Sequence, residues 1–205
     1  ENFGSDIKHA YSVARLMKKH DLLWMATGVR CKSVGRKDIQ FFKEHNCSAL
    51  KFGVESGSQK ILNSMEKKFL TSDVFRAVST CIEFGLFSPL AIMLGMPGET
   101  SQTAQETGVF IGKISSEMGV HPKLLEYDLF YALPLPGTPL YEYGMQVGFI
   151  DSSVDGVEEY MESVTNAGAY KRYFMNVNGA NYSEVLSWDW IVKLESSQIY
   201  GEPLP

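Results

Sequence analysis

The residues best suited to chemistry are a few polar side chains that follow an apolar segment. Glu55 and Ser56 leave this segment, and Lys67 lies in the loop before the next long helical pattern. A carboxylate accepts hydrogen bonds and a hydroxyl both donates and accepts them, so the pair is suited to the vicinal hydroxyls of a ribose. Glu55 could instead cap the following turn, and Lys67 could pair with a carboxylate or remain in solvent.

A turn rich in glycine offers backbone atoms in place of side chains. Gly95, Met96, Pro97 and Gly98 directly follow an apolar run. Glycine lets the backbone approach a flat ligand closely, and proline fixes φ and has no N–H group. An ordinary tight turn between a strand and a helix would use the same residues, so both interpretations stay open at this point.

Motifs of several common enzyme classes are absent from the sequence. It has no P-loop, no GxGxxG, no HExxH and no GxSxG. The histidines are isolated, and the three cysteines, Cys31, Cys47 and Cys81, are spaced too widely for a disulfide framework or a zinc site. We therefore expect reduced, buried thiols, and hydrolase or zinc chemistry is disfavoured.

The composition is that of an ordinary globular domain. The chain has 205 residues, of which 44% are hydrophobic and 21% charged, with a formal net charge of -5. No basic run is present, no apolar stretch reaches the roughly 20 residues of a membrane span, and the first residues do not resemble a signal peptide. We expect a cytoplasmic protein that binds neither nucleic acid nor membrane.

Alternating strands and helices would position the polar residues. The hydrophobic pattern predicts buried strands at residues 22–30, 48–57, 90–94 and 124–133. It predicts helices at 5–20, with Ser5 as the N-cap, and at 37–45 and 72–84. Two more helices are predicted from Thr100 or Ser101 to about Gly119 and from Thr138 to Gly148. This alternation is typical of an α/β fold with a parallel sheet, in which all strand ends meet at the edge where ligands bind.

The texture of the sequence changes after about residue 150. Residues 151–205 are acidic and less periodic, until a helix-like segment begins near Asn181 with Glu184 in capping-box spacing. We interpret 151–205 as a C-terminal extension of the α/β part formed by 1–150, with a helix that covers some of its surface.

Four strings of residues, in this order, closely resemble the radical SAM enzymes. They are FGVESGSQKIL, MEKKFLTSD, AIMLGMPGET and LPLPGTPLYEYG. The resemblance covers roughly residues 1–150 and is strongest to the branch that often carries an N-terminal cobalamin-binding domain. It implies a partial TIM-like (βα)6 barrel, S-adenosylmethionine (SAM) as cofactor, and a 4Fe-4S cluster on a CxxxCxxC loop. Reductive cleavage of SAM would start radical chemistry, with methyl transfer as one outcome if cobalamin is bound.

The resemblance also implies roles for individual residues. It places Glu55 and Ser56 at the ribose or amino-acid moiety of SAM and Lys67 near the SAM carboxylate. It places a further set around the adenine: Gly95, Met96, Pro97, Gly98 and Leu135. Arg30 matches an arginine that is frequent in the family and would reach the SAM carboxylate or the substrate. Cys31, directly after it, departs from the commonest pattern.

The sequence departs further from the family pattern at the iron–sulfur cluster, because no cysteines have CxxxCxxC spacing. The chain opens without Met, and Glu1-Asn2-Phe3 is similar to the end of the family's second strand. We therefore expect a C-terminal fragment that is inactive alone, with the cluster ligands in a preceding part of the same protein. Its first strand would have an open flank, and the fragment would be poorly soluble.

Two other functions remain open on the sequence. One is a non-catalytic α/β ligand-binding or interaction module that has lost the cluster. The other is a TIM-barrel enzyme for a phosphorylated metabolite, which the three prolines of LPLPGTPL suit poorly because proline has no N–H to donate. The substrate, a small molecule or a peptide, is not identified by the sequence.

Overall fold

The computed structural model describes residues 3–120, 122, 128–165 and 172–201. Strands and helices alternate through most of this range. The elements are α1 (Ile7–Lys19), β1 (Trp24–Val29), α2 (Arg36–Glu44), β2 (Cys47–Glu55), α3 (Gln59–Ser64), α4 (Thr71–Glu83), β3 (Leu90–Leu94), α5 (Ser101–Met118), β4 (Asp128–Tyr131), α6 (Pro139–Gln146), α7 (Val154–Val164) and α8 (Tyr182–Tyr200).

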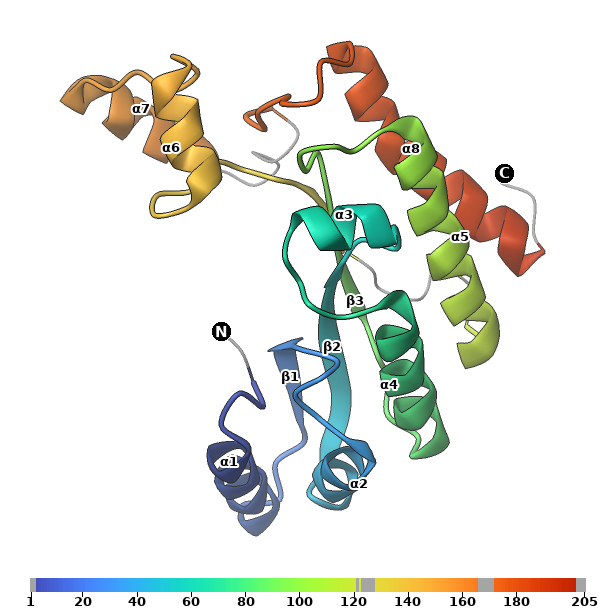
Figure 1. Cartoon of the computed structure of the whole chain (residues 1–205). Helices are drawn as coiled ribbons and strands as arrows, with labels where there is room; N and C mark the ends of the chain where they lie inside the picture. The colour runs from blue at the N-terminus through green and yellow to red at the C-terminus, as the bar shows by residue number, and fades with distance from the viewer. Residues whose placement is uncertain (1–2, 121, 123–127, 166–171, 202–205) are drawn as a thin grey trace.

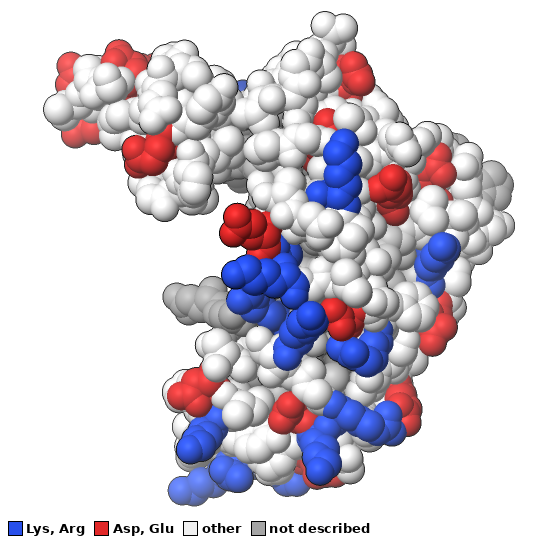
Figure 2. Space-filling model, viewed as in Figure 1, with Lys and Arg blue, Asp and Glu red and all other residues white. Residues whose placement is uncertain are grey.

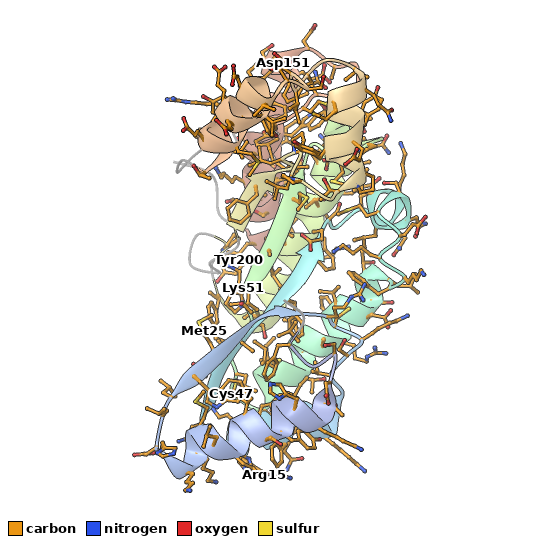
Figure 3. The ribbon with its side chains drawn as sticks, turned by 90° about the vertical axis from the view of Figure 1, so that its left-hand side faces the viewer. Arg15, Met25, Cys47, Lys51, Asp151 and Tyr200 are labelled. Carbon is orange, nitrogen blue, oxygen red and sulfur yellow. The ribbon has the colours of Figure 1, made fainter. Side chains whose placement is uncertain are left out.

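The strands form one parallel sheet in the order β1-β2-β3-β4. Helices α2, α4 and α5 cover one face of the sheet, and α8 lies outside them against α5 (Figure 1). In the described ranges no helix packs across the opposite face, which Figure 3 shows from the front. The predicted α/β class with a parallel sheet is therefore confirmed.

The main core lies between the sheet and its helices. Its fully buried side chains include Phe42 on α2, Phe52 on β2 and Ile111 on α5, and Trp188 of α8 joins them from outside. These positions alternate along the strands or recur at helical spacing, which is why the hydrophobic pattern predicted their elements. Within the described residues, no helix is both long and apolar enough to cross a membrane.

Several helix ends follow the predicted signals. Thr100 caps α5 and Gly119 ends it with φ of 62°, while Thr138 caps α6 and is followed by Pro139. These caps are hydrogen bonds between residues only three positions apart, so the local sequence is enough to form them.

One predicted cap residue is wrong, and one predicted capping box does not form. Asp6, not Ser5, caps α1, because its carboxylate accepts from the N–H groups of residues 8 and 9. Asn181 is the N-cap of α8 but makes no side-chain cap hydrogen bond. The capping box with Glu184 does not form, since the Glu184 carboxylate accepts from Ser101 Oγ at 3.3 Å instead.

Helices α3 and α7 were not predicted. Helix α3 has six residues, too few for a clear period, and Tyr160 is the one buried residue on α7. Helix α7 packs instead on α6, where Tyr141, Ile150 and Tyr160 form a second, small core. We call residues 139–164 the α6–α7 arm; it projects from the rest of the molecule (Figure 1).

Helix α8 approaches α5 closely because glycines face it. A Cβ atom on Gly108 would lie 2.7 Å from the Val192 carbonyl oxygen, and one on Gly112 would lie 2.8 Å from that of Ser196. Trp188 Nε1 of α8 donates to Ser101 Oγ, at the N-terminus of α5, at 3.2 Å. This packing brings the residues just before α8 to the carboxyl edge of the sheet.

Candidate ligand site at the carboxyl edge of the sheet

Strand β2 ends in a β-bulge that redirects Glu55. Gly53 pairs with Ala91 and Glu55 with Ile92, so Val54 is an extra residue in the ladder. Glu55 has φ of 66°, a left-handed conformation that costs a non-glycine residue roughly 1–2 kcal/mol. Bulges often re-aim a side chain beside a functional site.

Lys67 meets the redirected carboxylate. Its Nζ donates to Glu55 Oε1 at 2.8 Å, and the two side chains are 23% and 18% exposed. Glu66 and Lys68, which flank Lys67, also have positive φ, 52° and 58°. Strained non-glycine residues persist only where the surroundings hold them, and they cluster at functional sites. The ion pair and its strained neighbours therefore mark this edge of the sheet as the candidate site.

Ser56 supports the turn behind Glu55. It is fully buried, and its Oγ lies 3.1 Å from Thr107 Oγ1 and accepts from the Ser58 N–H at 3.1 Å. Gly57 is needed here because a Cβ would lie 2.5 Å from that of Phe110. In this structure the Ser56 hydroxyl is engaged within the chain and joins the turn to α5.

The second predicted feature is the loop of residues 95–98, which we call the 95–98 loop. Gly95 and Gly98 have φ of 82° and 86°, values that favour glycine. The Glu99 carboxylate lies beneath the loop, and its Oε2 accepts from Gly95 N at 2.6 Å and Met96 N at 3.2 Å. Glu99 is 1% exposed, and this burial raises its pKa to about 7.

Asn178 holds the other side of the same loop. Its Oδ1 accepts from Gly98 N at 2.7 Å, and its Nδ2 donates to Met96 O at 3.1 Å. Because Pro97 has no N–H, every backbone donor of the loop is either absent or used within the chain. The loop backbone can therefore offer a ligand only carbonyl oxygens.

A cavity of about 780 Å³ lies beside this loop. It is bounded by the tips of β3 and β4, the loop between α3 and α4, the start of α6, and Val177. Most of its lining is apolar and includes Met65, Met93, Met96, Leu133, Leu140 and Tyr143. The volume and lining are those of a small-molecule site.

The structure brings some predicted residues to this cavity and leaves others outside it. Met96 and Pro97 line the cavity, and so does Glu66, the neighbour of Lys67. Leu135 is 46% exposed and is not part of the lining. Arg30 is exposed after β1, and its side chain makes no hydrogen bond or ion pair with any residue that the structure describes.

Charge is divided across the mouth of the site. Figure 2 shows acidic side chains on the α6–α7 arm and basic side chains gathered on the body below it. Lys32 Nζ donates to Lys68 O at 3.1 Å. This contact joins the end of β1 to the strained loop that carries Lys67.

The described residues do not fit an iron–sulfur cluster. They contain no group of three or more His, Cys, Asp or Glu side chains that could hold a metal ion. Cys31, Cys47 and Cys81 are buried on separate elements, and burial raises their thiol pKa values to about 11, 12 and 11. Such thiols stay protonated, whereas cluster ligands are thiolates. The expectation of reduced, buried cysteines is confirmed.

Glu99 and Asn178 were not predicted as site residues. Glu99 lies within the GMPGET string, four residues from Gly95, so its role as a cap of that loop is readable from the local sequence. Asn178 is 80 residues from Gly98, and no local signal connects them.

Two curated proteins are similar to this chain over about two thirds of its length. No protein-family model matches the chain. Over 148 residues, 71% of the chain, it is 29% identical to an uncharacterized methyltransferase of Pyrococcus horikoshii. Over 146 residues, 67% of the chain, it is 30% identical to the threonylcarbamoyladenosine tRNA methylthiotransferase MtaB of Thermotoga maritima. The chain spans 30% and 31% of the lengths of these two curated relatives.

A solved structure shares the fold. It is the radical S-adenosylmethionine methyltransferase TsrM from Kitasatospora setae with cobalamin and a 4Fe-4S cluster bound, matched with a TM-score of 0.52 and 16% identity. The match covers 92% of this chain and 36% of that one. At this level of identity the similarity concerns the α/β architecture.

Proposed function

We propose that this chain forms the SAM-binding wall of a radical SAM enzyme that transfers a methyl or methylthio group. In this proposal its βα units belong to a partial (βα)6 barrel, and the uncovered face of the sheet is the barrel interior. The observation that carries the proposal is the Glu55–Lys67 pair in strained backbone, next to Glu66, which lines the apolar cavity that the pair itself does not line. The names of the two curated relatives support the class of reaction.

The site is chemically complementary to SAM. The methionyl part of SAM carries an ammonium and a carboxylate, and Glu55 and Lys67 present the two opposite charges. The apolar cavity suits the adenine, and a 95–98 loop that offers only carbonyls favours a ring with an amino group to donate. Arg30, which has no acidic partner among the described residues, is available to an anionic group of the ligand or substrate.

SAM supplies a methyl group or, after reduction, a 5′-deoxyadenosyl radical. To this chain we assign only the holding and orienting of SAM. The cluster ligands are assigned to another part of the full-length protein, because the described residues do not fit the cluster and the chain spans under a third of its relatives. That other part is its proposed partner, and no residue described here is assigned to cobalamin.

A non-catalytic SAM-binding module is the second candidate. The observation that favours it is the lack of a metal-holding group within the described ranges. The two functions differ in one respect: both bind SAM, but only the enzyme releases 5′-deoxyadenosine or methylated product when supplied with a strong reductant.

The test is calorimetric titration of SAM into the full-length protein and its variants. We expect Glu55→Gln and Lys67→Met each to weaken SAM binding roughly tenfold, because each removes a charge-assisted hydrogen bond. Glu83→Gln is the matched control, since it breaks the exposed Arg36–Glu83 pair on the helical side. Unchanged SAM affinity in a folded Glu55→Gln variant would remove the central site assignment.

A further inference from the structure

We infer that residues 172–181, which directly precede α8, are part of the ligand site, with Asn178 as the positioning residue that sets the 95–98 loop against the cavity. The ligand class is an adenine nucleoside, and in this respect the inference rests on the proposed function. No motif in this segment suggested such a role.

The side-chain amide of Asn178 makes two hydrogen bonds with the loop. One atom accepts from Gly98 N at 2.7 Å and the other donates to Met96 O at 3.1 Å. An amide group is planar, so its two polar atoms have a fixed separation, and both loop positions are set together. Val177, the preceding residue, lines the cavity that Met96 and Pro97 also line. The segment therefore lines the cavity through Val177 and holds the 95–98 loop, which also lines it, through Asn178.

Contacts that do not involve the loop hold this segment in place. Phe174 is 2% exposed and stacks on Tyr131 and Tyr182, with ring centroids 4.7 and 5.2 Å away. Asn176 Nδ2 donates to Ala180 O at 2.6 Å, and its Oδ1 accepts from Asn178 N at 3.2 Å. Asn178 is thus placed by the sheet and by α8, and it in turn places the loop.

The outer half of the loop, Pro97 and Gly98, depends on the hydrogen bonds that Asn178 makes. Glu99 holds only the inner N–H groups, those of Gly95 and Met96. On the outer side, Ser64 Oγ donates to Pro97 O at 3.3 Å, and nothing lies within 4 Å of a Cβ position on Gly98. Without the Asn178 amide, the turn would keep the hydrogen bond from Glu99 N to Met96 O at 3.0 Å, but Gly98 N would lose its acceptor. The ligand would then have to order more of the turn, and that ordering lowers affinity.

The experiment compares Asn178→Ala with Asn181→Ala in the full-length protein. Asn181 lies three residues later and its side chain makes no cap hydrogen bond, so it matches the change without touching the loop. Affinities for SAM and for 5′-deoxyadenosine are measured by calorimetry. Hydrogen exchange of the Gly98 amide is measured without ligand.

We expect Asn178→Ala to weaken SAM and 5′-deoxyadenosine by the same factor, about five- to tenfold, because the loop contacts the part that the two ligands share. We also expect exchange at Gly98 to become roughly tenfold faster, since its N–H loses its acceptor. Asn181→Ala should change neither. A merely structural role would lower the unfolding temperature without this equal loss for both ligands.

Three outcomes separate the possible failures. Faster exchange at Gly98 with unchanged affinity for both ligands would overturn the positioning role and leave the proposed function intact. A loss of affinity for SAM with unchanged affinity for 5′-deoxyadenosine would also overturn the positioning role. A wild-type protein that binds neither ligand would overturn the proposed function itself, and with it the ligand class assigned here.

Discussion

At the scale of single residues, Glu99 is a buried carboxylate that has no ion pair with any residue that the structure describes. Oε2 holds two N–H groups of the 95–98 loop, while Oε1 has no hydrogen-bond partner among the described residues. Burial therefore raises its pKa from 4.5 to about 7 despite the two hydrogen bonds. The folded protein binds this proton more tightly than the unfolded chain does. Glu99 thus stabilises the fold fully below its unfolded pKa, and the contribution is lost as pH rises through the folded pKa.

This direction of the pH dependence of stability gives a prediction for Glu99→Gln. Between about pH 5 and about pH 7.5 the wild-type free energy of unfolding should fall by roughly 2 kcal/mol more than that of the variant, whose amide does not titrate. Urea unfolding at several pH values measures the difference. Parallel pH profiles for the two proteins would show that Glu99 titrates normally in the folded state.

At the scale of elements, the contact between α5 and α8 decides where the C-terminal segment lies. A Cβ on Gly108 would meet Glu195 Cβ at 2.6 Å and Val192 O at 2.7 Å, and the second of these is backbone that cannot rotate away. Any larger residue must push the helices apart. Because α8 directly follows the segment that carries Asn178, such a shift would also move the clamp on the loop.

We therefore predict that Gly108→Ala destabilises the protein by roughly 1–3 kcal/mol, as overpacking does. A loss of stability would be informative, because a glycine-to-alanine change inside a helix is otherwise stabilising by up to about 1 kcal/mol. Gln105→Ala, on the exposed side of α5, is the control and should stay within about 0.5 kcal/mol of wild type. Equal or greater stability of Gly108→Ala in urea unfolding would refute the close approach.

At the scale of the whole molecule, β1 is an edge strand with apolar residues at its start. Leu23 is 77% exposed, and Leu22 and Met25 are each 51% exposed. No strand pairs with the outer side of β1 in the part of the chain that the structure describes. An open edge with exposed apolar side chains favours pairing with other chains. Figure 3 shows Met25 on this side of the sheet.

We predict that residues 1–205 expressed alone self-associate through this edge, and that Leu23→Lys reduces the association. A lysine on an edge strand opposes pairing because its charge would have to be desolvated. Leu194→Lys is the control, since Leu194 is 38% exposed on α8, which packs on α5 and not on β1. Sedimentation velocity over a range of concentrations reports the result. A chain that stays monomeric, or equal effects of both substitutions, would contradict the prediction.

The amino-acid sequence alone determined every element except α3 and α7, together with the short-range parts of the site. Strand and helix positions follow from hydrophobic period, and the caps at Thr100 and Thr138 join residues three apart. The 95–98 loop and its carboxylate Glu99 are likewise within one short string. All of these depend on forces between near neighbours in the chain, which are nearly the same in any surroundings.

The tertiary structure decided which distant residues meet. The bulge that turns Glu55 toward Lys67 depends on pairing of β2 with β3, and the fixing of Ser56 depends on Thr107, 51 residues away. Asn178 reaches the loop only because glycines on α5 let α8 pack closely. Contacts of this kind are set by the fit between packed surfaces, which no local pattern of residues records.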